Sequence, residues 1–230
     1  MQRTRIKFCG LTDLDDLHNA VSLGVDFIGL VFYEKSPRAI NIEQAALLRR
    51  ALPSFVQSVG LFVNASAEQI LAASNAVGLD ILQFHGDESS AQCREIFNLC
   101  KRVGNTRAFW QALRLKSPDD LLPWAQPKEL NANSTPEGLL LDSFSTQFGG
   151  SGHGFDWSWV EEGSVYRPTH IPLIASGGLN PSNVADAMGK IKPFAVDTSS
   201  GIQTSNPRRK DALLMERFVE QVIRADASLL

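Results

Sequence analysis

The chain has 230 residues, 43% of them hydrophobic and 20% charged, with a formal net charge of −3. This composition can supply a large buried core, and a chain of this length can form one α/β barrel rather than two domains. The slightly negative charge gives no attraction for nucleic acid or anionic membranes, and the longest apolar runs are too short to span a bilayer. The basic N-terminus lacks the apolar segment of a signal peptide. We therefore expect a cytoplasmic protein without nucleic-acid or membrane partners.

Short apolar runs of strand length alternate with helical patterns along the sequence. The runs occupy residues 5–8, 26–32, 56–63, 81–84, 108–114, 138–141, 172–175 and 194–196. Apolar residues recur at helical spacing within residues 14–22, 42–51, 67–77, 89–99, 119–124, 158–162, 182–188 and 209–225. The sequence therefore predicts eight strand-helix units.

The number and spacing of these units indicate the fold. Eight units in 230 residues correspond to about 29 residues each, which suits a βαβ repeat. We expect an α/β protein with a (β/α)8 TIM-barrel architecture, in a single domain over residues 1–230. A doubly wound open sheet is the alternative, although such sheets commonly have fewer strands. Residues 126–136 are interpreted as a surface connection rather than a domain boundary.

The three cysteines have different surroundings. They cannot all pair, and their number is far below that of a disulfide-stabilised protein, so we expect reduced thiols. Cys93 and Cys100 fall in a helical apolar pattern and are interpreted as buried helix residues. Cys9 instead ends the first apolar run and precedes Gly10, which makes it a candidate reactive thiol, although burial is the commoner state of a lone cysteine.

Polar residues follow the predicted strands. In a barrel the carboxyl ends of the strands meet on one face, so the residues just beyond each run determine the chemistry. Surface polarity explains any one of these residues taken singly, and their accumulation at one end predicts a site. They are Cys9, the turn 36–38, Asn64, His85, Asp87, Arg114, Asp142, Ser176 and Asp197.

Two turns rich in small residues follow the seventh and eighth strands. In the first, Asn180 can cap a helix that begins at Pro181, and the helix N-terminus favours an anion. Such a pair of turns is where TIM barrels bind phosphate, although ordinary loop chemistry explains either turn alone. The candidate phosphate-binding residues are Gly177, Gly178, Ser199, Ser200 and Gly201.

Eight sequence strings together resemble phosphoribosylanthranilate isomerase over nearly the whole chain. Any one of them could occur by chance, but eight in the right order are very improbable by chance. They are KFCG (7–10), GLVFYEKSPR (29–38), GLFVN (60–64), LQFHGDE (82–88), LLD (140–142), GGSGHGFDW (149–157), SGGLNP (176–181) and VDTSSG (196–201).

The resemblance implies an enzyme of tryptophan biosynthesis. Its reaction converts N-(5-phosphoribosyl)anthranilate to 1-(2-carboxyphenylamino)-1-deoxyribulose 5-phosphate by an Amadori rearrangement. By resemblance, Cys9 is the general base and Asp142 the general acid. These roles suit the chemistry, because a carboxylic acid can protonate the ring oxygen and a thiolate can remove the C2′ proton of the resulting Schiff base. A helix-capping or loop aspartate is the alternative for Asp142.

The resemblance also suggests substrate-binding residues. Arg38 can bind the anthranilate carboxylate through two parallel hydrogen bonds. Without the resemblance, it would be interpreted as a solvated surface arginine. Asp197 matches a family aspartate near the ribose hydroxyls, with a turn anchor as its alternative. Strand alternation places Gln83 and His85 on one face. We expect them to have a structural or substrate-positioning role rather than to transfer protons.

Activation of Cys9 is less accessible to the sequence. A free thiol is mostly protonated at neutral pH. Alternation places Lys7 on the same face, deeper in the barrel, so we do not expect it to be the group that lowers the pKa of Cys9.

The glycine-rich segment 143–157 is expected to be a mobile cover over the substrate. It departs from the family at His153 and Gly154, where a bulkier or charged pair is common.

No metal or organic cofactor is implied, because the histidine spacing does not form a metal site. Two alternatives to the isomerase remain. One is another phosphate-binding barrel enzyme of the same pathway, such as an indole-glycerol-phosphate synthase, whose lysine and glutamate set this sequence lacks. The other is a non-catalytic phosphosugar-binding barrel, which would not need Cys9 and Asp142. We expect a monomer or a homodimer acting on a small phosphosugar-anthranilate substrate.

Overall fold

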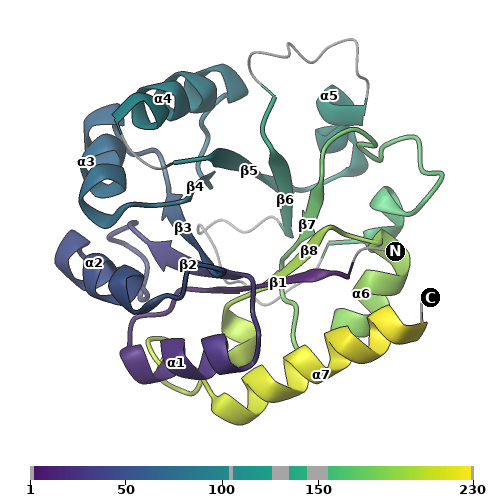
Figure 1. Cartoon of the computed structure of the whole chain (residues 1–230). Coiled ribbons are helices and arrows are strands. Elements are labelled where there is room, and N and C mark those ends of the chain that lie inside the picture. Colours follow the sequence, from purple (N-terminus) through teal and green to yellow (C-terminus); the bar gives the residue numbers. More distant parts are fainter. Residues whose placement is uncertain (1–2, 104–105, 126–134, 144–154, 229–230) are drawn as a thin grey trace.

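Eight parallel strands form a closed barrel in the computed structural model of the chain (Figure 1). The structure describes residues 3–103, 106–125, 135–143 and 155–228. Neighbouring strands pair in sequence order and β8 pairs with β1, which confirms the predicted (β/α)8 barrel. The strands are β1 (Arg5–Cys9), β2 (Phe27–Val31), β3 (Gln57–Phe62), β4 (Ile81–Phe84), β5 (Ala108–Leu115), β6 (Gly138–Ser143), β7 (Leu173–Ala175) and β8 (Ala195–Thr198).

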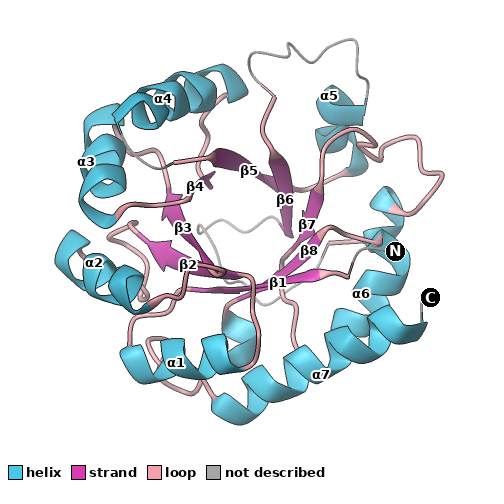
Figure 2. Cartoon of the chain, viewed as in Figure 1, coloured by secondary structure: helices cyan, strands magenta, loops and turns pink. Residues whose placement is uncertain are grey.

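Helices surround the barrel and cover its outer face (Figure 2). They are α1 (Leu14–Ser22), α2 (Ile42–Ala51), α3 (Ala67–Val77), α4 (Ser90–Val103), α5 (Leu122–Ala125), α6 (Val184–Ile191) and α7 (Ala212–Ser228), with 3₁₀ helices η1 (Pro118–Leu121), η3 (Trp157–Val160) and η4 (Ser200–Ile202). Among the described helices, none is long and apolar enough to cross a membrane.

Helix ends explain why several bounds agree with the sequence. Asn41 and Gln44 form a reciprocal capping box at the start of α2, and Ser66 and Gln69 form another at the start of α3. In each box a side-chain oxygen accepts from a backbone N–H that the first helical turn leaves without a partner. Both helices therefore begin and end where the sequence predicts.

Several helix predictions were wrong in detail. The helix expected over 119–124 is divided between η1 and α5, and α7 begins at Ala212 rather than at residue 209. Residues 158–162 do not form an α-helix, because η3 is a single 3₁₀ turn and Gly163 follows it with a φ of 90°. The expected helix start at Pro181 is a turn in which Asn180 Oδ1 accepts from Ser182 N at 2.8 Å. The α-helix α6 begins only at Val184. Asn180 therefore caps a turn that precedes the helix.

Four strands extend beyond their predicted ends, β1 and β5 by one residue and β6 and β8 by two, and the longer differences concern the site. Predicted to end at residues 141 and 196, β6 runs to Ser143 and β8 to Thr198. Asp142 pairs in register with Arg114, and Asp197 with Lys7. Both aspartates therefore project from the barrel itself and not from the loops that follow.

The core has two layers. Inside the barrel, Phe27 and Trp110 meet edge to face with ring centroids 5.0 Å apart, among buried side chains from all strands but β1. A larger cluster fills the space between the outer face of the strands and the helices. Parallel strands are covered on both faces in this way, which explains their continuous apolar runs. The result is one domain, in which the predicted site residues lie toward the carboxyl ends of the strands.

Candidate active site

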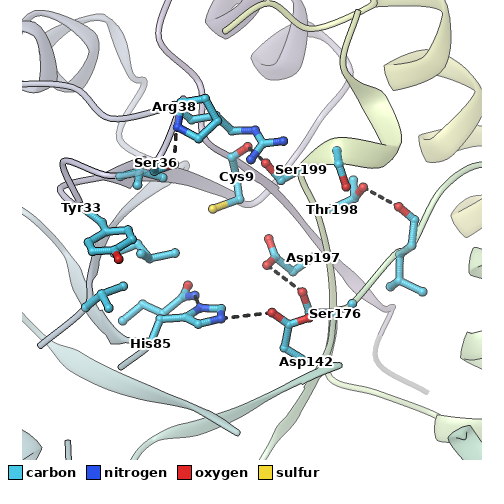
Figure 3. A pocket seen from close by; sticks show the side chains of 18 of the residues that line it. Cys9, Tyr33, Ser36, Arg38, His85, Asp142, Ser176, Asp197, Thr198 and Ser199 are labelled. Carbon is cyan, nitrogen blue, oxygen red and sulfur yellow. Dashed lines mark hydrogen bonds and ion pairs between the residues drawn. The ribbon is translucent and has the colours of Figure 1, made fainter. Parts of the chain in front are cut away.

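A cavity of about 490 Å³ opens at the carboxyl ends of the strands (Figure 3). Its volume lies within the range of small-molecule sites. Most of the site residues predicted from sequence line it together: Cys9, Arg38, Gln83, His85, Asp142, Gly177, Gly178, Asp197, Ser199 and Ser200. Among the described residues the lining also includes Tyr33, Lys35, Leu61 and Val63.

Cys9 ends β1, and its sulfur points into the cavity (Figure 3). Only 5% of the residue is exposed. The facing residue on β2 is Gly29, and a β-carbon added there would lie 2.6 Å from Cys9 Sγ. The thiol therefore occupies the space that the glycine leaves open.

Lys7 contradicts our expectation that it lies too deep to influence Cys9. The Lys7 ammonium group is completely buried and donates to Asp197 Oδ1 at 2.8 Å. Its charge also acts on the Cys9 thiol, two residues further along the same face of β1. Lys7 does precede Cys9 on β1, but a lysine side chain is long enough to reach the level of the next residue on the same face of the strand.

The pKa of Cys9 reflects opposing effects. Burial raises it above the ordinary thiol value, whereas Lys7 lowers it. Asp197 adds to the increase and Lys210 opposes it. For Lys7 itself, burial acts to lower the pKa, but the charges of Asp197 and Cys9 raise it above its ordinary value. Lys7 therefore carries its charge inside the barrel.

Asp142 is held by His85 and by its own neighbour. His85 Nε2 lies 3.0 Å from Asp142 Oδ2, and Ser143 N donates to Asp142 Oδ1 at 2.8 Å. Gln83 Nε2 lies 3.0 Å from His85 Nδ1. Gln83 and His85 thus fix the orientation of the carboxyl group.

Arg38 reaches the cavity from the loop after β2. Its terminal Nη2 donates to Gln203 Oε1. Its Nε is buried and has no hydrogen-bond partner within the described residues. Burial lowers the pKa of Arg38, while the nearby Cys9 acts in the opposite direction. A free Nε beside a terminal nitrogen is the geometry that binds a carboxylate through two parallel bonds.

The two small-residue turns meet at one side of the cavity. Gly177 and Gly178 both have positive φ, at 80° and 71°. Within the described part of the chain, we find no acceptor for their backbone N–H groups. The Ser199 hydroxyl donates to the Cys9 carbonyl at 2.8 Å, which ties the second turn to β1.

Gly201 has a different position from the one the sequence suggested. It is not among the residues that line the cavity. A β-carbon there would lie 2.0 Å from the Leu179 carbonyl oxygen. Gly201 therefore allows the two turns to pack against each other, so that both can face one ligand group.

Lys210 is a residue that sequence reasoning missed. Its Nζ donates to the Ser199 carbonyl at 2.9 Å, from the chain between η4 and α7. Burial lowers the pKa of Lys210 to about 7, and the charge of Arg38 adds to this effect. The only sequence signal was a cationic run, Arg208 to Lys210, which is typical of an exposed surface.

Other polar residues at this end of the barrel belong to a separate network. Asn64 Nδ2 donates to Asp87 Oδ2 at 3.3 Å, and Arg114 forms an ion pair with Asp87. These three residues do not line the cavity. The expected glycine-rich cover falls largely on residues 144–154, outside the described residues. Among the residues that the structure describes, no group of three potential ligands could hold a metal ion.

Comparison with known proteins gives a consistent assignment. The family model for N-(5'phosphoribosyl)anthranilate (PRA) isomerase matches residues 6–221. A protein named N-(5'-phosphoribosyl)anthranilate isomerase from Methylibium petroleiphilum is 46% identical over 225 residues, which cover 98% of this chain and 96% of the relative. One of the same name from Ralstonia nicotianae is 44% identical over 236 residues, covering 100% and 96%.

Solved structures agree with the sequence relatives. Phosphoribosyl anthranilate isomerase from Thermotoga maritima superimposes with a TM-score of 0.81 at 36% identity, covering 96% of this chain and 99% of that one. A phosphoribosyl anthranilate isomerase in complex with reduced 1-(o-carboxyphenylamino)-1-deoxyribulose 5-phosphate has a TM-score of 0.78 at 34% identity, with the same coverage. The chain belongs to the N-(5'-phosphoribosyl)anthranilate isomerase family.

Proposed function

We propose that the cavity converts N-(5'-phosphoribosyl)anthranilate to 1-(o-carboxyphenylamino)-1-deoxyribulose 5-phosphate, with Asp142 as general acid and Cys9 as general base. The chain is an isomerase of tryptophan biosynthesis by its family. The observation that carries the residue assignment is that a thiol and a carboxyl group line one cavity together with an arginine and two small-residue turns. These groups correspond to the parts of the substrate.

Asp142 begins the reaction. Its carboxyl proton passes to the ring oxygen, the bond between C1′ and that oxygen breaks, and the nitrogen lone pair forms a Schiff base at C1′. His85 forms a hydrogen bond with one carboxyl oxygen and the Ser143 N–H donates to the other, so the carboxyl group keeps one orientation as the ring opens. A fixed orientation reduces the entropy that proton transfer would otherwise lose.

Cys9 completes the isomerisation. The positively charged Schiff base acidifies C2′, and the thiolate takes the C2′ proton to give an enolamine and a neutral thiol. The enolamine then tautomerises to the ketone, so the overall reaction gains and loses no atoms. Because Cys9 stands at the end of a barrel strand, its position is fixed more rigidly than that of a loop residue.

The two ends of the substrate have separate partners. The anthranilate carboxylate binds Arg38, whose buried Nε lacks a partner among the described groups. The phosphate binds at the turns containing Gly177, Gly178, Ser199 and Ser200. Asp197 faces the ribose between them, at 5% exposure in the cavity wall. These contacts orient C2′ toward Cys9.

An assay of the purified protein tests this function. Anthranilate fluorescence is followed while the substrate is generated in place, and we expect a protein-dependent decrease together with formation of the deoxyribulose phosphate. A non-catalytic binder would leave the fluorescence decay unchanged. A synthase of the same pathway would instead accept the deoxyribulose phosphate and release an indole product. Either result would contradict the proposal.

We also propose that the chain works in the cytoplasm as a monomer or a homodimer. Its three cysteines are free and buried, as expected for a protein that needs no disulfide. One similar structure is described as monomers generated from a dimeric isomerase of Thermotoga maritima, at 34% identity. Light scattering of the purified protein would give the mass and decide between the two states; a tetramer or larger assembly would contradict both.

A further inference from the structure

Lys7 is a buried charge that the reaction scheme does not use. Its side chain is 0% exposed in the barrel interior. Lysine is almost never fully buried without a partner, and even a paired buried charge adds little stability compared with apolar side chains of similar size. The pair that Lys7 forms with Asp197 therefore calls for a reason other than stability.

The register of the strands brings three ionisable groups together. Lys7 and Asp197 are direct partners on β1 and β8, joined by the 2.8 Å contact between Nζ and Oδ1. Cys9 lies two residues beyond Lys7, on the same face of β1, and its side chain interacts with the Lys7 ammonium group. Lys7 thus interacts with Asp197, which binds it directly, and with Cys9, the proposed base.

We propose that Lys7 is a positioning residue that stabilises the Cys9 thiolate, and that Asp197 limits this effect by sharing the same ammonium group. The proposal rests on the proposed role of Cys9 as general base. When Cys9 takes the C2′ proton it becomes neutral, and Lys7 keeps its own proton and its contact with Asp197. No proton passes through Lys7, so it acts only through Cys9.

Other charges face the thiol from neighbouring elements. Two further cationic groups interact with Cys9 by charge. They are Lys210, from the chain before α7, and Arg38, from the loop after β2. Asp197 is the anion coupled to it, from β8. His85 and Asp142 line the same cavity but are paired with each other. Lys7 differs from Lys210 because its charge lowers the pKa of Cys9 more strongly, and it stands on the same face of β1 as the thiol.

The rate of Cys9 alkylation by iodoacetamide tests the proposal. Peptide mapping by mass spectrometry separates Cys9 from Cys93 and Cys100, and below the thiol pKa the rate is proportional to the thiolate fraction. For Lys7→Met we expect alkylation at least about tenfold slower at a fixed pH, which corresponds to a one-unit rise in pKa. For Asp197→Asn we expect the opposite, a faster reaction, because Lys7 then serves Cys9 alone.

Opposite shifts separate an electrostatic role from a structural one. A loosened barrel would increase alkylation in both variants, whereas thiolate stabilisation moves them in opposite directions. Lys7→Met leaves Asp197 unpaired and could unfold the protein, so the double variant Lys7→Met/Asp197→Asn serves as a second test. It has no buried charge at this pair and should alkylate more slowly than Asp197→Asn alone.

The outcomes also separate this inference from the proposed function. Equal alkylation rates in the wild type and in Lys7→Met, or in Asp197→Asn and the double variant, would overturn the role of Lys7. Full activity of Cys9→Ala would instead overturn the role of Cys9 in catalysis. The first measurement reads thiol ionisation without turnover, and the second reads turnover without the thiol.

Discussion

Cys9 and Gly29 face each other in register on β1 and β2, and the thiol fills the space that a side chain at position 29 would need. A β-carbon there would lie 2.6 Å from Sγ and 2.9 Å from the Cys9 Cα. The glycine in the second strand is therefore part of the active-site geometry, although it has no side chain that could mark it as such.

Gly29→Ala should displace Cys9 and reduce turnover. A displacement of about 1 Å of a reacting group can cost about 10²-fold in rate, and we expect a loss of that order in kcat. Gly189→Ala is the matched control, because it lies in α6 with open space around the added carbon. That control should keep full activity and gain about 1 kcal/mol of stability. Equal kcat values in the two variants would contradict the close contact.

His85→Ala should reduce kcat by about tenfold or more, because Asp142 loses the hydrogen-bond partner that orients it. The effect should depend on Asp142. In an Asp142→Asn background, the same substitution should add little further loss, since the two residues act as one unit. A double-mutant cycle on kcat measures this coupling. Fully additive losses would show that His85 acts independently of Asp142.

Arg38→Met should weaken substrate binding. A charge-assisted bidentate contact contributes about 1.5–3 kcal/mol, so kcat/KM should fall by about 10- to 100-fold. Arg38→Lys should not restore the activity, because an ammonium group cannot present two parallel N–H donors. A substrate analogue without the carboxylate should bind the wild type and Arg38→Met equally well. A preference of the wild type for this analogue would contradict the assignment.

Lys210 should make stability depend on pH. Its pKa is about 7 in the folded protein and near 10.5 in an unfolded chain, so the unfolded chain holds the proton more strongly in this interval. Stability contributed by this group therefore rises as the pH increases from about 7 toward 10.5. Urea unfolding of the wild type and Lys210→Met at both ends of the interval measures it. The wild type should gain stability relative to the variant at high pH, and a constant difference would contradict the lowered pKa.

The fold and most of the cavity could be predicted from sequence because their signals are local. Apolar periodicity placed each strand, and the residue after each apolar run fell at the barrel mouth. Element ends were less accurate. Asp142 and Asp197 were expected just past strands that in fact include them, since pairing with neighbouring strands, not the apolar run, decides where a strand ends.

The charged groups around Cys9 could not be predicted in the same way. Lys7 was placed on the correct face, but its reach depends on how a long side chain bends between two partners. Lys210 belongs to a cationic run that gives no sign of burial, and only the packing of the chain before α7 encloses it. The gap at Gly29 depends on the register of two strands, which periodicity alone does not define.

Turnover of Cys9→Ala tests the central claim most directly, because removing the sulfur removes the proposed base and leaves the phosphate and carboxylate contacts in place. We expect kcat to fall by about 10²- to 10⁴-fold, the usual contribution of a general base, while a product analogue still binds with its wild-type affinity. Cys93→Ala, at a buried thiol of α4, is the control and should retain its activity. A Cys9→Ala enzyme within a few-fold of the wild-type kcat would contradict the account.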